Sequence, residues 1–300
     1  MIISVSPHIK SRETIASVMR DVLIALAPAG VAAVYLFGTN VLWILCASVS
    51  FCVISEYVFQ KVTKKRVGVY DLSAVVTGVL LAFSLPPGVP VWMVCVGAVF
   101  AIVVGKEIFG GIGYNPFNPA LVGRAFLHIS WPTEMSSWVL PYSNLTSASP
   151  LSVVKFGLNG DIPAYLELFF GNVAGCIGET SKIALLAGVV YLVMRKQIKL
   201  LAPFSYIITV VVVSLVAGRD AVFHLLSGGL ILGVFFMATD PVTTPVPAKG
   251  KIIFGAGCGI LTMLIRLWGG FPEGVCYSIL IMNILVPFID RATIPRRFGA

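Results

Sequence analysis

The sequence predicts an all-α integral membrane protein with about ten transmembrane helices, arranged as two inverted five-helix repeats that contain short, broken helices. Three observations lead to this prediction: an apolar composition, ten separate apolar runs, and similar motifs in the two halves of the chain. Of the 300 residues, 58% are hydrophobic and only 11% are Asp, Glu, Lys or Arg. Soluble domains carry about 25% charged residues. This chain therefore has too few charges to cover a soluble surface, which excludes a soluble enzyme and a disordered chain.

Ten apolar runs are candidates for membrane crossings, although several are shorter than the roughly 20 residues of a full span. They cover residues 21–37, 41–59, 71–85, 89–104, 119–131, 181–194, 200–217, 221–237, 252–265 and 275–288. The segment 132–180 is the one long non-spanning part. We therefore expect a single membrane domain over residues 1–300, with a first repeat at 21–131, a loop at 132–180 and a second repeat at 181–290.

The positions of Lys and Arg predict the orientation in the membrane. With a cytoplasmic N-terminus, the basic residues on the cytoplasmic side are Lys10, Arg12, Arg20, Lys61, Lys64, Lys65, Arg66, Lys106, Arg195, Lys196, Lys199, Lys249, Lys251, Arg291, Arg296 and Arg297. Those on the opposite side are Lys155, Lys182, Arg219 and Arg266. Cytoplasmic loops carry the excess of positive charge. Both termini are therefore expected in the cytoplasm and the 132–180 loop outside it, with the bilayer rather than a nucleic acid as the partner of the basic residues.

The repeat is visible in two runs that begin after an acid and end at a proline. Asp71 precedes the run that ends at Pro86, and Asp220 precedes the run that ends at Asp240 and Pro241. Five spans in each half force the halves into opposite orientations, as in many transporters. Gly- and Pro-interrupted helices offer free backbone groups to a ligand. Alternatively, the small residues only allow close helix packing.

Two polar motifs lie next to these runs. The sequence GGIGYNPFNPA at 110–120 precedes a span, and its Asn115 and Asn118 can cap a helix or donate amide hydrogens to a ring system. Asp240 is followed by hydroxyl residues and two prolines, which suits Na⁺ or a proton relay. Asp71 is the matching acid of the first half. Local capping of turns is the alternative for each of these residues.

A third polar motif, NLTSASPL at 144–151, lies in the predicted outer loop. Its small hydroxyl residues are open to solvent by composition. A plain polar loop is the alternative interpretation.

Together these motifs resemble the family of D subunits of Rnf complexes, which is related to the B subunits of sodium-pumping NADH:quinone reductases. The segments that carry the resemblance are 110–120, the GETS sequence at 178–181, MATDPVT at 237–243 and DLSA at 71–74. The resemblance covers nearly the whole chain. It implies a membrane component of a complex, in a bacterial or archaeal cell membrane, that couples electron transfer between ferredoxin and NAD to Na⁺ or H⁺ movement.

The resemblance also implies the cofactors. Family members carry FMN covalently, through a phosphoester to a hydroxyl in a Ser/Thr-Gly-Ala-Thr motif followed by Pro-Leu, and a flavin transferase attaches it. Here the aligned segment reads TSASPL, which gives Ser149 as the acceptor and Thr146 as the second candidate. Related proteins also hold non-covalent riboflavin among the spans, for which Asn115 and Asn118 are the candidates. Asp71 and Asp240 are the candidates for an ion pathway.

Two other functions fit the same sequence features. An inverted repeat with broken spans is equally typical of a small-solute channel or secondary transporter. The chain could also be a scaffold that holds redox partners without a cofactor of its own. No NAD or ferredoxin motif is present, so those sites are expected on other membrane and peripheral subunits of the complex.

Overall fold

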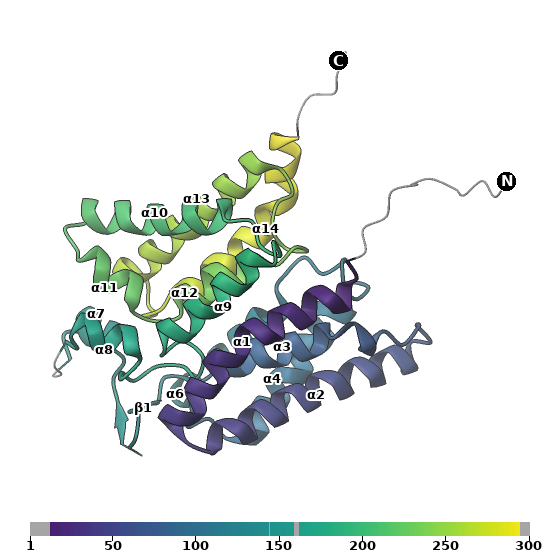
Figure 1. The fold of residues 1–300 in the computed structure, drawn as a ribbon, viewed down its shortest axis with the longest axis horizontal. Helices are drawn as coiled ribbons and strands as arrows, with labels where there is room; N and C mark the ends of the chain where they lie inside the picture. Colours follow the sequence, from purple (N-terminus) through teal and green to yellow (C-terminus); the bar gives the residue numbers. More distant parts are fainter. Residues whose placement is uncertain (1–12, 144, 159–161, 295–300) are drawn as a thin grey trace, which may run out of the picture.

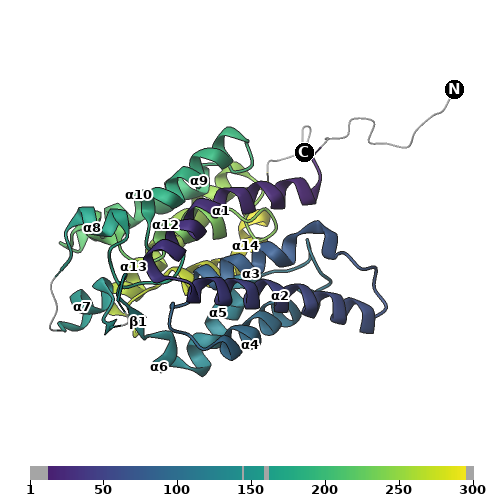
Figure 2. The same cartoon turned by 60° about the horizontal axis from the view of Figure 1, so that its bottom comes forward.

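The computed structural model describes residues 13–143, 145–158 and 162–294. The predicted cytoplasmic residues Lys10, Arg12, Arg296 and Arg297, and Asn144 of the loop motif, lie outside these ranges. Two groups of helices, α1–α5 and α9–α14, pack side by side, and the segment that connects them lies at one end of the molecule (Figure 1). The start of α1 and the end of α14 lie at the other end in both views (Figure 2).

The first group consists of α1 (Ile15–Phe37), α2 (Asn40–Val62), the 3₁₀ helix η1 (Val69–Asp71), α3 (Ser73–Phe83), α4 (Val91–Ile102), the π-helix η2 (Val103–Glu107) and α5 (Pro119–Ser130). The connecting segment contains α6 (Pro132–Met135), β1 (Trp138–Val139), β2 (Thr146–Ser147), α7 (Pro150–Phe156) and α8 (Tyr165–Phe170). The second group consists of α9 (Lys182–Met194), α10 (Leu201–Val216), α11 (Ala221–Leu226), α12 (Leu230–Leu232), the π-helix η3 (Gly233–Met237), α13 (Ala248–Trp268) and α14 (Val275–Thr293).

Each predicted apolar run contains helix, so the predicted all-α membrane fold is confirmed. Among the described residues, α1, α2, α13 and α14 are long and apolar enough to cross a membrane on their own. The other runs form shorter or interrupted helices. Ser227, Gly228 and Gly229 separate α11 from α12, and Gly228 has a φ of 68°, which interrupts a right-handed helix. Several prolines follow α3, and they prevent its continuation because proline has no backbone N–H to donate.

The two groups use the same order of helix contacts. In the first, α2 packs against α3 and α4, and α4 packs against α5. In the second, α10 packs against α11 and α13, and α13 packs against α14. This is the pattern that an internal repeat would give.

Helices α1 and α9 join the two groups. Gly188 of α9 faces α1 so closely that a Cβ atom on it would lie 2.0 Å from the carbonyl oxygen of Ala25. A backbone oxygen cannot turn aside as a side chain can. The contact between the two groups therefore depends on the missing side chain of Gly188.

We predict that Gly188→Ala destabilises the protein by about 1–3 kcal/mol, because α1 and α9 must separate to admit a methyl group. Thermal unfolding of the purified protein in detergent measures the loss. Gly270→Ala is the matched control, since a Cβ at Gly270 would meet nothing within 4 Å. Equal melting temperatures for wild type and Gly188→Ala would show that the interface yields more easily than the geometry indicates.

Candidate functional site

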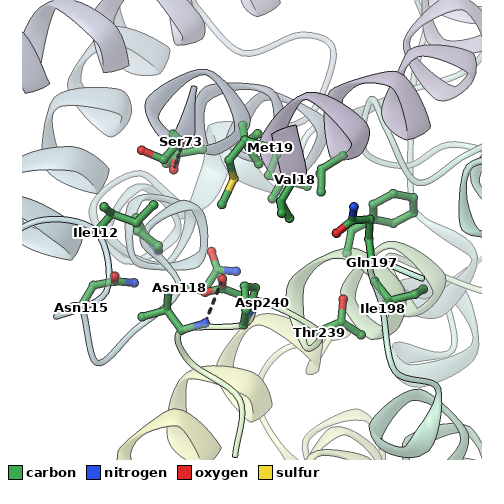
Figure 3. A pocket seen from close by; sticks show the side chains of 18 of the residues that line it. Val18, Met19, Ser73, Ile112, Asn115, Asn118, Gln197, Ile198, Thr239 and Asp240 are labelled. Carbon is green, nitrogen blue, oxygen red and sulfur yellow. Dashed lines mark hydrogen bonds between the residues drawn. The ribbon is translucent and has the colours of Figure 1, made fainter. Parts of the chain in front are cut away.

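A cavity of about 270 Å³ lies between the two helix groups. Its walls are largely apolar, with side chains from α1, α3, α9 and η3. Its polar groups come from the turns after η2 and η3, from α3 and η2 themselves, and from the segment after α9. The polar residues that line it are Ser73, Thr77, Lys106, Asn115, Asn118, Gln197, Thr239 and Asp240. Figure 3 shows Ser73 and Met19 on one side of the cavity and Asn118 and Asp240 across from them. Such a cavity suits a flat, mostly apolar molecule with polar edges.

Three of the residues singled out from the sequence meet in this cavity although they are far apart in the chain. Asn115 and Asn118 come from the turn before α5, and Asp240 comes from the turn after η3. Each turn follows a π-helix, a rare element that is frequent at functional sites. The two turns thus bring a polar segment of each helix group to one place.

Both asparagines also hold the fold. The Asn118 Oδ1 accepts from the backbone N–H of Ala120 at 3.1 Å and caps α5, while its Nδ2 donates to the carbonyl of Met237 at 3.4 Å in the other group. The Nδ2 of Asn115 donates to the carbonyl of Phe117 at 3.0 Å, and its Oδ1 has no partner among the described residues. The capping alternative is therefore correct for Asn118, and Asn115 keeps an acceptor for a ligand.

The two predicted acids are placed differently. Asp240 lines the cavity and accepts from the backbone N–H of Val242 at 3.4 Å and from the Thr243 hydroxyl at 3.0 Å. Asp71 does not line it. Its Oδ1 accepts from the N–H of Ser73 at 2.8 Å and from the Ser73 hydroxyl at 2.5 Å, so Asp71 reaches the cavity only through Ser73.

The predicted attachment residues lie in the connecting segment. Ser149 is the N-cap of α7, half-buried, and its Oγ accepts from the backbone N–H of Ser152 at 3.2 Å and lies 2.9 Å from the Ser152 hydroxyl. Thr146 is exposed on β2, which pairs with β1. Ser149 also lines a second, small cavity of about 30 Å³ together with Glu179, Lys182 and Glu273.

Beneath Ser149 lies a buried cluster of charged groups that the sequence did not single out as a unit. Arg124 forms an ion pair with Glu273 and donates to the Cys176 sulfur at 3.5 Å. The Oε1 of Glu273 accepts from the backbone N–H of Gly229 at 2.6 Å, and the Oε1 of Glu179 accepts from that of Cys176 at 2.9 Å. The two carboxylates and the thiol lie within 4.8 Å of one another. Arg124 already supplies the cation that this group of atoms would otherwise attract.

Burial and then the charge of Glu273 raise the pKa of Glu179 to about 7. The pKa of Glu273 is lowered. Burial acts to raise it, but the nearby charge of Arg124 and the hydrogen bond from the N–H of Gly229 outweigh the effect of burial. Arg124 pairs with Glu273 and not with Glu179, and the Glu179 Oε2 is buried without a hydrogen-bond partner. Glu179 is therefore the carboxyl of this pair that takes up a proton first as the pH falls.

Sequence reasoning missed Lys106, which it placed among the cytoplasmic basic residues. Lys106 is only 2% exposed and lines the central cavity. The available signal was its position directly after an apolar run, because charges at membrane depth are rare and tend to be paired or functional.

Comparison with known proteins agrees with this architecture. Residues 2–299 match the model of the NQR2, RnfD, RnfE family. The chain is 50% identical to the D subunit of the Na⁺-translocating ferredoxin:NAD⁺ oxidoreductase complex of Acetobacterium woodii, over 99% of this chain and 95% of the relative. It is 43% identical to the D subunit of the proton-translocating ferredoxin:NAD⁺ oxidoreductase complex of Clostridium ljungdahlii, over 99% and 96%. The D subunit of an ion-translocating oxidoreductase complex of Escherichia coli is 35% identical, over 99% and 98%.

The raised pKa of Glu179 predicts a specific pH dependence of stability. The Glu179 carboxyl binds its proton more tightly in the folded state than in the unfolded state, where its pKa is 4.5. Proton binding therefore stabilises the folded state fully below pH 4.5, and this contribution is lost as the pH rises to about 7. The loss amounts to about 3 kcal/mol. In Glu179→Gln this contribution is absent.

The difference in melting temperature between wild type and Glu179→Gln, measured in detergent at pH 5 and pH 8, tests this. Wild type should lose more stability than the variant between these values. An equal difference in melting temperature at pH 5 and pH 8 would mean that Glu179 is ionised over this whole pH range.

Proposed function

Because the chain belongs to the NQR2, RnfD, RnfE family, we propose that it is the flavin-carrying D subunit of an Rnf-type electron transport complex. Relatives of 50% and 43% identity are named as D subunits of ferredoxin:NAD⁺ oxidoreductase complexes, one Na⁺-translocating and one proton-translocating. The chain is accordingly a membrane component of such an oxidoreductase. Its partners are the other subunits of the complex, and the ion it helps to move is Na⁺ or H⁺.

The observation that carries the proposed redox role is the cavity between the two helix groups. Its apolar walls fit the faces of a flavin ring, and the free Oδ1 of Asn115 and the amide of Gln197 offer polar contacts at its edge. At about 270 Å³ it lies just below the range for small-molecule sites, roughly 300–1,000 Å³. A non-covalent riboflavin held there would supply the redox chemistry, while the protein fixes its position and excludes water.

Ser149 fits the role of the covalent attachment site for FMN. Its hydroxyl lies in the connecting segment, outside both helix groups, where a flavin transferase can reach it. The residue is half-buried rather than enclosed, and among the described residues its oxygen forms hydrogen bonds with the Ser152 hydroxyl and N–H alone. A phosphoester at this oxygen leaves its acceptor role toward Ser152 intact. Thr146 is the second candidate, since its side chain is exposed and it begins the same TSASPL segment.

The proposed ion pathway uses Asp240 and Asp71. Asp240 is the carboxylate among the cavity-lining residues, and Asp71 connects to the same cavity through Ser73. Reduction of a ring in the cavity adds negative charge where the dielectric constant is low, which favours arrival of a cation. The proposed sidedness places both termini in the cytoplasm and residues 132–180 outside it.

A small-solute channel or secondary transporter is the alternative that the repeated, interrupted helices also suit. Uptake of a small solute by liposomes that contain only this chain would favour it. A colourless protein that still binds its partner subunits would instead favour a scaffold.

We predict that the chain, produced with a flavin transferase, carries one covalent FMN at Ser149. The intact mass should exceed the sequence mass by one FMN phosphoester, and the denatured band should fluoresce in a gel. Ser149→Ala should lose both signals, Ser149→Thr should keep them, and Thr146→Ala is the matched control. A wild-type chain without added mass from such a host would contradict covalent attachment, and loss of the flavin only in Thr146→Ala would move it to the second candidate.

We further predict that Asp240→Asn lowers ion translocation by the assembled complex at least tenfold while the flavin content stays that of wild type. The change removes the charge of the cavity-lining carboxylate and keeps its size. Ion uptake into proteoliposomes, driven by reduced ferredoxin and NAD⁺, measures the effect. Asp220→Asn is the matched control, because Asp220 caps α11 and contacts Tyr165 near the connecting segment. Translocation at the wild-type rate in Asp240→Asn would exclude Asp240 from the pathway.

A further inference from the structure

A second buried charged cluster lies behind the central cavity, where α2, α3 and η2 meet. Lys106 is its cation, and its Nζ donates to Glu56 Oε1 and to the Ser73 hydroxyl, both at 2.6 Å. Gln60 Nε2 donates to Glu56 Oε1 and to Glu107 Oε1, both at 3.1 Å. Glu56 and Glu107 are each 1% exposed.

We propose that Lys106 binds the polar edge of the ring in the central cavity and favours its reduced, negatively charged form. The proposal rests on the proposed second flavin. It assigns to Lys106 a role as a positioning and electrostatic group for a planar, carbonyl-bearing redox ring.

The arrangement of the cluster directs the positive charge toward the cavity. Lys106 and its partner Ser73 line the cavity, whereas Glu56 and Glu107 do not. The cation therefore lies closer to a bound ring than the carboxylates that balance it. An electrostatic interaction weakens with distance and is strong at low dielectric constant, so the ring interacts more with Lys106 than with Glu56 or Glu107 behind it.

Lys106 also retains bonding capacity. An ammonium group has three N–H donors, and among the described residues Lys106 uses two, toward Glu56 and Ser73. The third can donate to a ring carbonyl. Lys106 is the basic residue among those that line the cavity. Its helix, η2, is a π-helix, so the backbone departs from α-geometry where this side chain is presented.

The charge balance of the reaction is simple. A one-electron donor of the complex, itself oxidised by one electron, gives that electron to the ring, which gains one negative charge. No covalent bond forms or breaks in this step. The positive charge of Lys106 stabilises the added charge, and Glu56 opposes it. Removing the charge of Lys106 should therefore lower the redox potential of the ring, and removing the charge of Glu56 should raise it.

The test uses the full chain in detergent with Ser149→Ala, so that no covalent flavin contributes to the spectrum. Bound flavin is quantified after acid release, and its potential is measured by spectroscopic titration with dithionite against reference dyes. Lys106→Met should lower the ratio of reduced to oxidised ring at a fixed potential at least tenfold, which is about 59 mV for one electron. Lys106→Arg keeps the charge, so its flavin potential should stay close to that of the parent chain.

Two further variants separate electrostatics from structural support. Glu56→Gln keeps Lys106 and removes its counter-ion, so it should shift the potential upward. The double variant Lys106→Met, Glu56→Gln leaves no unpaired charge from this pair and keeps the protein foldable if Lys106→Met alone does not fold. It should still bind flavin, at a lower potential than Glu56→Gln.

The outcomes distinguish this inference from the proposed function. If the two single variants, Lys106→Met and Glu56→Gln, bind flavin at the same potential as the parent chain, the role of Lys106 is overturned. The proposed second flavin then still stands. Absence of flavin from the parent chain that contains Lys106 would contradict the second flavin itself, and this inference with it.

Discussion

Interrupted helices in a membrane protein leave backbone N–H and C=O groups that water cannot satisfy, and the structure depends on how these groups find partners. After α3 ends, the loop before α9 supplies them: the N–H groups of Ile177 and Gly178 donate to the carbonyls of Leu85 and Phe83 at 3.0 and 2.9 Å. At the break between α11 and α12, Arg266 donates to the carbonyls of His224 and Ser227, while the Glu273 carboxylate accepts from Gly229. The charged groups of Arg266 and Glu273 are thus partners for the broken backbone.

The need to supply partners for interrupted helices also explains a motif to which no ligand is assigned. The GETS motif at 178–181 is a docking segment: a Cβ on Gly178 would lie 2.3 Å from the Phe83 side chain, and Lys182 donates to the carbonyls of Glu179 and Thr180. Gly229 is required for a similar reason, since a Cβ there would lie 2.6 Å from Glu179 Oε2 and 2.7 Å from Glu273 Oε1. These residues bring the connecting segment, and with it Ser149, against the helices.

The sequence was sufficient for the existence of the helices and for the motifs that form the cavity, because apolar runs and Asx-Pro turns are local signals. The turns with Asn115, Asn118 and Asp240 lie in one cavity, although nothing local could indicate that contact. The charged clusters escaped prediction for the same reason. Lys106 and Glu56 are separated by 50 residues and Arg124 and Glu273 by 149, so only the packed fold brings each pair together. The π-helix η3 has no signature in the apolar pattern, since residues 233–237 are apolar throughout, whereas η2 ends in the charged residues Lys106 and Glu107.

The two charged clusters differ in sign, and this difference bears on how electron transfer could be coupled to ion movement. Around Glu179 and Glu273 lie three basic side chains, from Arg124, Lys182 and Arg266. Behind the central cavity, Lys106 is accompanied by the carboxylates of Glu56, Glu107 and Asp71. If flavins occupy Ser149 and the cavity, an electron that passes from the first to the second leaves a region of net positive charge for one of net negative charge. A fixed lysine can stabilise the added charge in each turnover but cannot cross the membrane. Coupling to ion movement therefore requires a mobile cation near the cavity, and the carboxylate of Asp240 on its wall is the group there that can attract one.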